Sequence, residues 1–429
     1  MQSLLLDRKV NRITGLQFST AITESFYTNF KQQTGRNVFP NNPHSNAAVN
    51  SLSLESENRF LLSGCADSSI KLWDMKQTQN VELIGDEMIR NSNSNSEEFI
   101  EDEDDEVQED EGDNYIYDHP KSTIVNIATI PRRAAHDYGV SCIQWWPYDS
   151  GMFVSSSFDH TVKVWDTNEL EVVHSFDMEN RVYSIDICGN TVNTRTSTAL
   201  VAVASDQPFI RILDLRTTAA AHSLSGHKGK TLSVKWHTQN PNILASGGYD
   251  GEVKIWDIRR SQSCLCRLDM LRTNSSSNGD VDDILKKASV KAHSGPVNGL
   301  AWDPMGHTLY TTGNDDKIRV WDMVSSYAPP INKLVNFGPL TRNKYPQTIP
   351  LLLSPSKETE LQYLMFPSDN GDIFIFRTID GKLVSRLLRK GTKNSGRTSS
   401  MVYMGNSSGT YLCGTMDGEI IKWSHSLDI

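Results

Sequence analysis

One pattern recurs along this chain at a nearly constant length. It consists of a histidine, a serine or threonine, an aspartate and a closing tryptophan, and the histidine and tryptophan pairs are His136 with Trp165, His227 with Trp256, and His293 with Trp321. Each copy holds three short alternating apolar runs separated by turn residues, which is the pattern of an antiparallel meander. Self-similarity at a fixed period indicates a repeat architecture in which neighbouring units bury each other's apolar faces. The recurrence therefore predicts several small antiparallel sheets.

The central copy begins with Gly226-His227 and ends with Trp256-Asp257, and these features resemble a WD40 repeat. Its turn at 249–251 is predicted to be a tight hairpin, because Gly251 allows positive φ and Asp250 can accept bonds from neighbouring N–H groups. In WD40 proteins the recurring residues form a hydrogen-bonded set that holds each blade, and the resemblance implies such sets here. Their members are His136, Ser155, Asp159 and Trp165; His227, Ser246, Asp250 and Trp256; and His293, Thr311, Asp315 and Trp321.

Seven repeats can be counted, which predicts an all-β, seven-bladed WD40 β-propeller with an N-terminal helical extension. The third repeat has Leu213 in the tryptophan place and the sixth has Phe376. Seven repeats of roughly 40–45 residues need about 280–315 residues. The 429 residues therefore leave room for an extension and insertions without a second domain. We expect an extension with a ring-closing strand at 1–45, the propeller at 46–425, and a disordered acidic insertion at 91–119 between the first two blades.

The first 45 residues do not form a repeat. Apolar and basic residues interleave between Leu4 and Leu16, which predicts a short helix ended by Gly15. The segment from Glu24 to Lys31 is compatible with helix or strand. The last repeat ends at Trp423 with few residues after it, so topology favours a strand that completes that blade and removes an exposed edge.

The formal net charge of -10 belongs to one loop. Residues 97–113 contain 12 acidic side chains and no basic one, so the rest of the chain has 42 basic against 40 acidic residues. Like charges at this density repel each other and predict disorder. The segment is either a solvated spacer or an acidic tail that docks on a basic partner or mimics nucleic acid. The nearly neutral remainder argues against direct nucleic-acid binding, which needs clustered cations.

No motif indicates catalysis or a cofactor. Gly229-Lys230-Thr231 lacks the earlier glycine of a phosphate-binding loop, because Leu224 occupies that place. The recurring Ser, His and Asp residues are assigned to structure, which leaves no defensible nucleophile or base. Cys264 and Cys266 are a lone pair without zinc-binding neighbours, and six scattered cysteines suit the reducing cytosol or nucleus. No apolar run approaches the roughly 18 residues of a membrane span, and no secretory signal is visible.

An arginine follows the repeat aspartate by two places in two adjacent blades, as Asp214 with Arg216 and Asp257 with Arg259. One interpretation is a solvent-facing arginine at a strand end. The other is an arginine that is presented to a carboxylate or carbonyl of a docking protein.

Beyond the repeat pattern, the chain resembles the Cockayne syndrome protein A family over roughly residues 1–425. The resemblance is closest from Gln144 to Asn168, which includes Trp146-Pro147-Tyr148-Asp149-Ser150-Gly151-Met152-Phe153, and it extends to 254–260, 292–300 and 334–338. The lengthened loops indicate a divergent, fungal member. The family implies a non-catalytic substrate receptor that docks onto a DNA damage-binding protein 1-type adaptor in a cullin 4 ubiquitin ligase. It acts in transcription-coupled nucleotide excision repair, in the nucleus, with a Cockayne syndrome B-type translocase at RNA polymerase II.

The resemblance also implies where the partner docks. The family uses an N-terminal helical extension and a face that carries Trp-Asp-x-Arg motifs. Carried over to this chain, the docking residues are Leu4, Leu5, Leu6, Asp214, Arg216, Trp256, Asp257 and Arg259. The alternative prediction is a generic WD40 scaffold in a chromatin or ribosome-assembly complex, which requires only the propeller.

Overall fold

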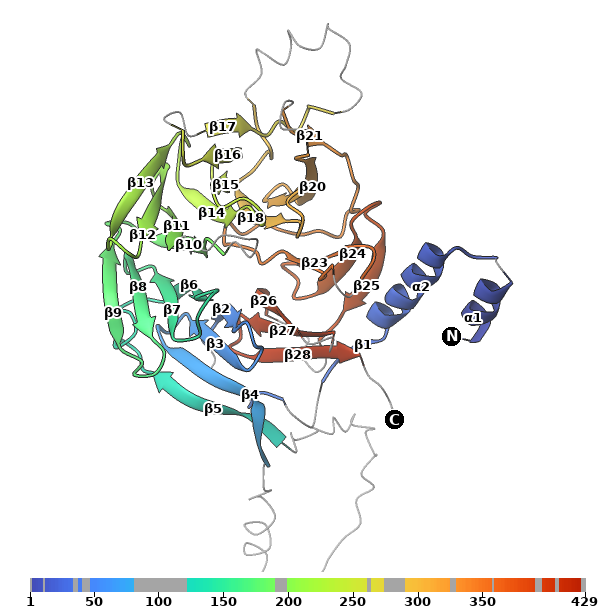
Figure 1. Ribbon diagram of the computed structural model, residues 1–429, viewed down its shortest axis with the longest axis horizontal. Helices are drawn as coiled ribbons and strands as arrows, with labels where there is room; N and C mark the ends of the chain where they lie inside the picture. The colour runs from blue at the N-terminus through green and yellow to red at the C-terminus, as the bar shows by residue number, and fades with distance from the viewer. Residues whose placement is uncertain are drawn as a thin grey trace, which may run out of the picture.

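The chain folds into a ring of seven small sheets around a central axis (Figure 1). A computed structural model describes residues 2–10, 12–33, 38–40, 47–80, 122–189, 199–260, 264–273, 290–324, 329–356, 359–389, 396–405 and 409–425. Each sheet in this part of the chain has four antiparallel strands. The predicted seven-bladed β-propeller is confirmed.

The blades follow one another along the chain, and each is built from the ring interior outward. The first blade has β2 (Val49–Leu54), β3 (Phe60–Cys65), β4 (Ile70–Asn80) and β5 (Ser122–Ile130). The second has β6 (Val140–Trp145), β7 (Met152–Ser157), β8 (Thr161–Asp166) and β9 (Val172–Asp177). The third has β10 (Val182–Ile187), β11 (Leu200–Ser205), β12 (Phe209–Asp214) and β13 (Ala219–Ser225). The fourth has β14 (Thr231–Trp236), β15 (Ile243–Gly248), β16 (Val253–Asp257) and β17 (Cys264–Arg267).

The remaining blades include the one that closes the ring. The fifth has β18 (Val297–Trp302), β19 (Thr308–Gly313), β20 (Lys317–Asp322) and β21 (Ile331–Asn332). The sixth has β22 (Leu352–Leu353), β23 (Tyr363–Pro367), β24 (Ile373–Arg377) and β25 (Leu383–Leu387). The seventh has β26 (Thr398–Met404), β27 (Thr410–Thr415), β28 (Ile420–His425) and, from the other end of the chain, β1 (Phe30–Gln32). Phe30 pairs with His425 and Gln32 with Trp423, so an N-terminal strand covers the edge of the last blade.

The segment before β1 differs from the sequence prediction. Helix α1 (Gln2–Lys9) ends before Gly15, and α2 (Gly15–Thr28) begins there. Thr14 and Gln17 form a capping box, in which each side chain accepts a hydrogen bond from the other's backbone N–H, so Gly15 starts a helix rather than ending one. The strand favoured for Glu24 to Lys31 is also wrong for most of that segment, because it is helical as far as Thr28.

The antiparallel order gives the ring two distinct faces. The turns between second and third strands and the connections between blades lie at one end, which we name the upper face. The loops between first and second strands and between third and fourth strands lie at the other end, the lower face. Because β1 is antiparallel to β28, α2 reaches the ring at the lower face.

The apolar core lies mainly between neighbouring blades. Trp236 and Trp256 of the fourth blade, for example, pack with Leu200 and Ile210 of the third. The acidic insertion predicted at 91–119 falls outside the described residues. The insertion connects β4 to β5, so it interrupts the first blade. The prediction that it lies between the first two blades is therefore wrong. The fourth strand of the first blade was not identified from the sequence, which explains this error.

Candidate functional site

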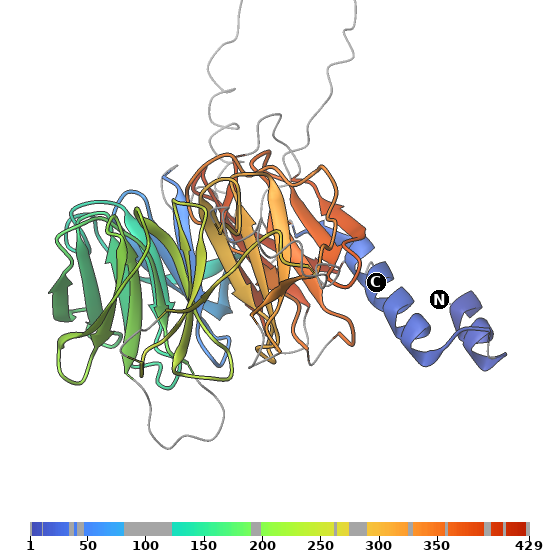
Figure 2. The same cartoon turned by 90° about the horizontal axis from the view of Figure 1, so that it is seen from above.

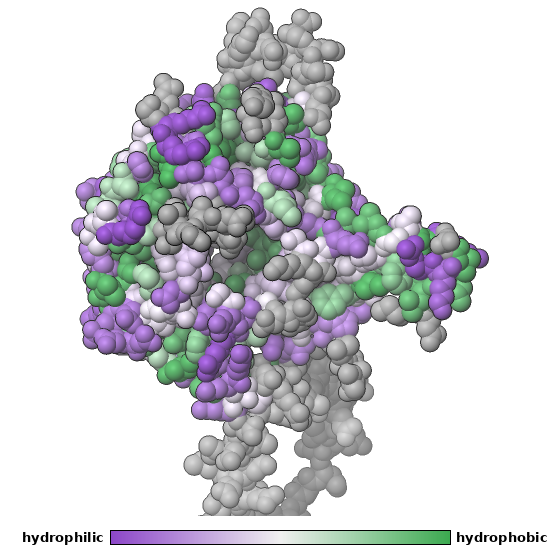
Figure 3. Space-filling view, in the orientation of Figure 1, coloured by the Kyte–Doolittle hydropathy of each residue, from purple (hydrophilic) through white to green (hydrophobic). Residues whose placement is uncertain are grey.

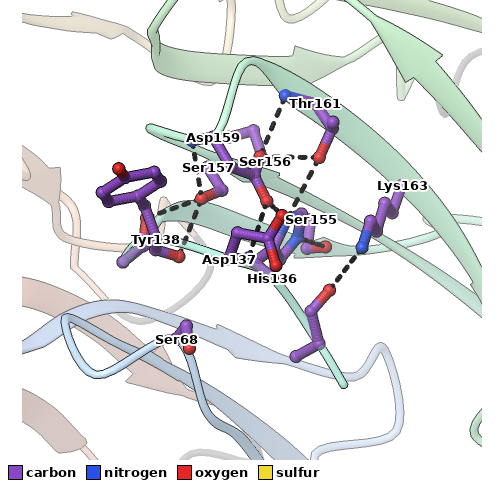
Figure 4. A network of polar contacts seen from close by, with 12 residues as sticks. Ser68, His136, Asp137, Tyr138, Ser155, Ser156, Ser157, Asp159, Thr161 and Lys163 are labelled. Atoms are coloured by element: carbon purple, nitrogen blue, oxygen red, sulfur yellow. Dashed lines mark hydrogen bonds and ion pairs between the residues drawn. The ribbon is translucent and has the colours of Figure 1, made fainter. Parts of the chain in front are cut away.

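The second blade shows how the recurring polar residues are used (Figure 4). His136 precedes β6, and its Nε2 lies 2.7 Å from Ser155 Oγ on β7, while its Nδ1 lies 2.8 Å from Asp159 Oδ2 in the following turn. Trp165 on β8 donates its Nε1–H to the same Ser155 Oγ at 2.8 Å. Since Ser155 accepts from tryptophan, its hydroxyl proton is donated to His136 Nε2. The Nδ1–H of His136 is therefore donated to the carboxylate.

The fourth and fifth blades repeat this geometry. His227 Nε2 lies 2.7 Å from Ser246 Oγ, and Trp256 Nε1–H donates to that oxygen at 2.7 Å. His227 Nδ1 lies 3.2 Å from Asp250 Oδ2. In the fifth blade the corresponding distances are 2.8 Å from His293 to Thr311, 2.9 Å from Trp321 to Thr311, and 2.8 Å from His293 to Asp315.

The charges in these sets are fixed by their surroundings. Burial alone would raise the pKa of Asp250, but hydrogen bonding and attraction from His227 outweigh it and lower the pKa to about 2. The pKa values of Asp159 and Asp315 are lowered for the same reason. Burial lowers the pKa of His293 against the opposing effect of Asp315, which favours a neutral ring. Both ring nitrogens of each histidine are committed to neighbours, so these residues hold strands together and are not free to act as bases or metal ligands.

In the other blades, too, the turn between the second and third strands has an aspartate whose side chain contacts a neighbouring residue. Its partner is an arginine in three of them, as Asp67 with Arg132 at 3.1 Å, Asp369 with Arg397 at 3.3 Å, and Asp417 with Arg389 at 2.8 Å. In the third blade Tyr183 donates to Asp206 at 3.4 Å. Asp206 and Asp369 were not predicted, because each lies seven residues before the core residue of its third strand, whereas the turn aspartates of the other blades lie six residues before it. An aspartate directly after the second strand is the signal that could have identified them.

The seventh blade lacks two members of the set, because Arg389 takes the place of the histidine beside Asp417 and the serine is also replaced. Cys413 occupies the place of the serine, and the buried Nε1–H of Trp423 has no hydrogen-bond acceptor among the described residues. Burial raises the pKa of Cys413, so this sulfur stays a neutral thiol, which is a weak acceptor. The set is therefore complete in three blades and partial in this one.

At the lower face, two exposed arginines each form an ion pair with the aspartate two residues before them in the sequence. Arg259 donates to Asp257 from Nε at 3.0 Å and from the terminal nitrogen at 2.9 Å. In the third blade, Arg216 makes the same contacts with Asp214 at 3.1 and 3.0 Å. These hydrogen bonds lower the pKa values of both aspartates. The arginine side chains are 61% and 64% exposed, so each presents a flat guanidinium edge to solvent.

A cavity of about 560 Å³ opens beside Arg259, between the fourth and fifth blades. Its lining includes Arg260, His237, Trp302 and Pro330. His237 Nε2 lies 3.1 Å from the Gly306 carbonyl, and its Nδ1 accepts from two backbone N–H groups, which leaves it no free nitrogen. Trp256, by contrast, is fully buried, so this predicted docking residue is not accessible to a partner.

The helical extension attaches to the ring through α2. Glu24 forms ion pairs with Arg377 at 2.7 Å and Lys382 at 3.5 Å in the sixth blade. The Tyr27 hydroxyl lies 3.2 Å from that of Tyr411 in the seventh. Helix α1 extends beyond the edge of the ring (Figure 2).

The extension exposes apolar side chains on both helices (Figure 3). Leu5, Leu6, Val10 and Leu16 are about half exposed to solvent, whereas Leu4 is partly buried. The structure brings the extension and the two arginines to the same face. It does not join them into one patch, because α2 contacts the sixth and seventh blades while the arginines lie on the third and fourth, across the ring (Figure 1).

Seven four-stranded blades, three of them held by complete His–Ser/Thr–Asp–Trp sets, define a WD40-repeat β-propeller protein. A model of the family described as WD domain, G-beta repeat matches residues 36–74, 127–166, 219–257 and 285–322.

Three relatives illustrate the range of similarity. The chain is 28% identical over 404 residues to the WD repeat-containing protein ATCSA-1 of Arabidopsis thaliana, with 80% of each chain covered. It is 28% identical over 295 residues to Radiation-sensitive protein 28 of Saccharomyces cerevisiae, covering 63% of this chain and 56% of that protein. It is 23% identical over 289 residues to the ribosome biogenesis protein ytm1 of Neurospora crassa, covering 64% and 53%. The chain thus spans about half of the length of the last two relatives.

The described residues contain no cluster of three or more His, Cys, Asp or Glu side chains that could hold a metal ion. None of their helices is long and apolar enough to cross a membrane.

Proposed function

We propose that this protein is a non-catalytic substrate receptor of a cullin 4 ubiquitin ligase and acts in transcription-coupled nucleotide excision repair in the nucleus. The observation that carries the proposal is the apolar helical extension, which is anchored to the lower face and leaves its own leucines in solvent. The similarity to ATCSA-1 and to Radiation-sensitive protein 28 supports the repair context. The partners would be a DNA damage-binding protein 1-type adaptor, a Cockayne syndrome B-type translocase and the RNA polymerase II machinery.

The extension has the composition of a helix that inserts into an apolar groove. Leu5 and Leu6 are exposed on α1, and the basic Arg8 and Lys9 follow at the helix end. Burying a leucine side chain contributes about 1.5–3 kcal/mol, so a few such residues can dominate binding. An exposed apolar patch with a polar border indicates an interaction site.

Arg259 and Arg216 are assigned a secondary role in this proposal. Each is already paired with an aspartate, so a partner would gain a fixed, pre-oriented guanidinium edge rather than a free charge. An exposed pair of this kind contributes little to stability, because solvent screens it. The cavity beside Arg259 could accept a partner side chain at the same place.

Affinity purification of tagged full-length chain after ultraviolet irradiation tests the proposal. The double variant Leu5→Glu/Leu6→Glu is expected to lose the adaptor and cullin, because it places charges in the buried contact. Arg259→Glu alone should reduce their recovery by less, because this arginine has the secondary role. Val173→Glu is the matched control, since Val173 is an exposed apolar residue on the outer strand of the second blade. Unchanged recovery of the adaptor by the double variant would show that the docking site is misassigned.

The similarity to the ribosome biogenesis protein ytm1 favours a second candidate, a scaffold in ribosome assembly. This function requires the ring and no ligase contact. It predicts that the purified chain retains ribosomal precursors with or without irradiation, and that its deletion causes no sensitivity to transcription-blocking DNA damage. Sensitivity to such damage without any ribosome-assembly defect would exclude it.

A further inference from the structure

The turn aspartates of the upper face are engaged by the fold itself. In six blades the turn aspartate is bonded to a histidine or an arginine, and in the third it accepts from Tyr183. The lowered pKa values of Asp159, Asp250 and Asp315 show that these carboxylates are ionised and satisfied where they are. They are therefore poor attachment points for a cationic partner.

The cations of the same face are less fully used. Arg181, Lys228, Arg342 and Lys344 are exposed, and none of them has an ion-pair partner among the described residues. Arg181 and Lys228 precede the first strands of the third and fourth blades. Two hydrogen bonds hold Arg342 and Lys344 at this face. The Arg342 carbonyl accepts from the backbone N–H of Asp369, and the backbone N–H of Lys344 donates to the Asp369 carboxylate. The upper face consequently presents exposed basic groups in the connections that precede the third, fourth and sixth blades.

Aromatic rings are interleaved with these cations. The Lys230 ammonium lies 5.5 Å from the ring centre of Tyr183 and 5.0 Å from that of Tyr249, so it is clamped between the third and fourth blades. Phe158 of the second blade meets Tyr183 edge-on at 6.2 Å. Tyr249 of the fourth blade is half exposed, and Tyr138 of the second blade is more exposed still. Exposed tyrosines close to cations are typical of the residues that contribute most to binding at protein interfaces.

We propose that the upper face binds an extended acidic segment of a partner protein, centred on the Tyr183–Lys230–Tyr249 clamp. Carboxylates of the segment would meet Lys230, Lys228 and Arg181, and its apolar atoms would lie on Tyr249. Asp137 and Asp206 are also exposed at the upper face and can accept backbone N–H groups of a peptide. A nucleic acid has few such N–H donors along its backbone to meet these two carboxylates, so a peptide fits this surface better. This surface lies on the opposite side of the ring from the docking residues proposed above.

Fluorescence anisotropy on the full chain tests this inference with three probes. They are a short labelled peptide that alternates glutamate and serine around a central tyrosine, the same peptide with lysine for glutamate, and a single-stranded oligothymidine. The acidic peptide is expected to bind, with an affinity that falls as salt is added. Lys230→Glu should weaken binding by about tenfold or more, as removal of a hot-spot residue does. Lys333→Glu is the matched control, because Lys333 is a half-buried lysine of the lower face.

Two further measurements keep the outcome decisive. If Lys230→Glu unfolds, Tyr249→Ala replaces it, since Tyr249 is half exposed and its ring is not needed by the core. A chain in which residues 97–113 are replaced by a glycine-serine linker removes competition from the chain's own acidic block. Absence of peptide binding in both chains, equal binding by the folded clamp variants, or tighter binding of oligothymidine would overturn the proposal. None of these outcomes depends on the adaptor contact at the lower face, so the two proposals fail separately.

Discussion

The third and fourth blades solve the same packing problem with different chemistry. In the fourth, Ser246 and Trp256 are joined by a hydrogen-bonded set, whereas in the third the equivalent places hold Val203 and Leu213, which are buried and entirely apolar. A buried hydrogen bond contributes a net of about 0.5–1.5 kcal/mol, and a buried aliphatic side chain about 1.5–3 kcal/mol. Either solution therefore suffices to hold a blade. The polar set adds a specific position for the turn aspartate at the upper face.

The largest effect on the free energy of unfolding is expected from truncating a large side chain in the core of an apolar blade. Phe376 fills the tryptophan place of the sixth blade and is fully buried against Phe337 and Phe374. We expect Phe376→Ala to lower the free energy of unfolding by about 3–5 kcal/mol, through lost burial and the cavity that remains. Chemical denaturation measures the change. A loss below about 1 kcal/mol would mean that this blade contributes little to the ring.

Placing the residue of one blade at the equivalent position of the other should lower the free energy of unfolding in both blades. Ser246→Val leaves the Trp256 Nε1–H and a nitrogen of His227 buried without their shared partner, and we expect a loss of about 2–4 kcal/mol. Val203→Ser places a hydroxyl in an apolar core at a cost of about 1–3 kcal/mol. The double exchange should be no better than the sum, since the sites lie in different blades. Thermal denaturation of the three variants would contradict the comparison if either single exchange were neutral.

The blades with aspartate–histidine sets should also be the ones sensitive to acid. Asp250 has a folded pKa of about 2, below its ordinary value of 3.8, so it contributes stability above about pH 4 that is lost as the pH falls towards 2. His293, whose folded pKa is lowered by burial, adds a loss that begins as the pH falls below 6.5. We expect Asp250→Asn to give a shallower decline of the free energy of unfolding below pH 4. An unchanged slope would show that Asp250 is not coupled to folding.

The smallest effect is a gain in the seventh blade. Cys413→Ser supplies the acceptor that Trp423 Nε1–H lacks, and we expect it to raise the free energy of unfolding by about 0.5–1.5 kcal/mol. Cys413→Ala is the control, because it removes the sulfur without adding an acceptor. Equal stability of the serine and alanine variants would indicate that the hydroxyl does not reach the indole.

The sequence predicted the ring because its information is local and repeated. Trp165, Trp256 and Trp321 lie at a nearly constant sequence distance from their histidines, and Leu213 and Phe376 occupy the matching positions of the other repeats. The outer strands were not identified, because most of their side chains are exposed and show little alternation, as in β13. The extent of β1 could not be predicted either, since three residues become a strand only by pairing with β28.

The candidate site was predictable in part. The exposed Arg216 and Arg259 follow from the repeat, because a position after the third strand always reaches the lower face. The clamp around Lys230 was not foreseen, because Tyr183 and Tyr249 belong to different blades and meet only in the closed ring. Capping at Thr14 overrode the usual meaning of Gly15, which is why the extension has two helices.

The seventh blade is assembled from opposite ends of the polypeptide, with Phe30 beside His425. During synthesis the first six blades can pair their strands while the ribosome is still elongating, but β1 must wait, unpaired, until β28 has been made. Contacts between such distant residues form late, because a very long loop has to close first. The nascent chain therefore carries an open strand for almost the whole of its production, and this is the interval in which a chaperone would protect it.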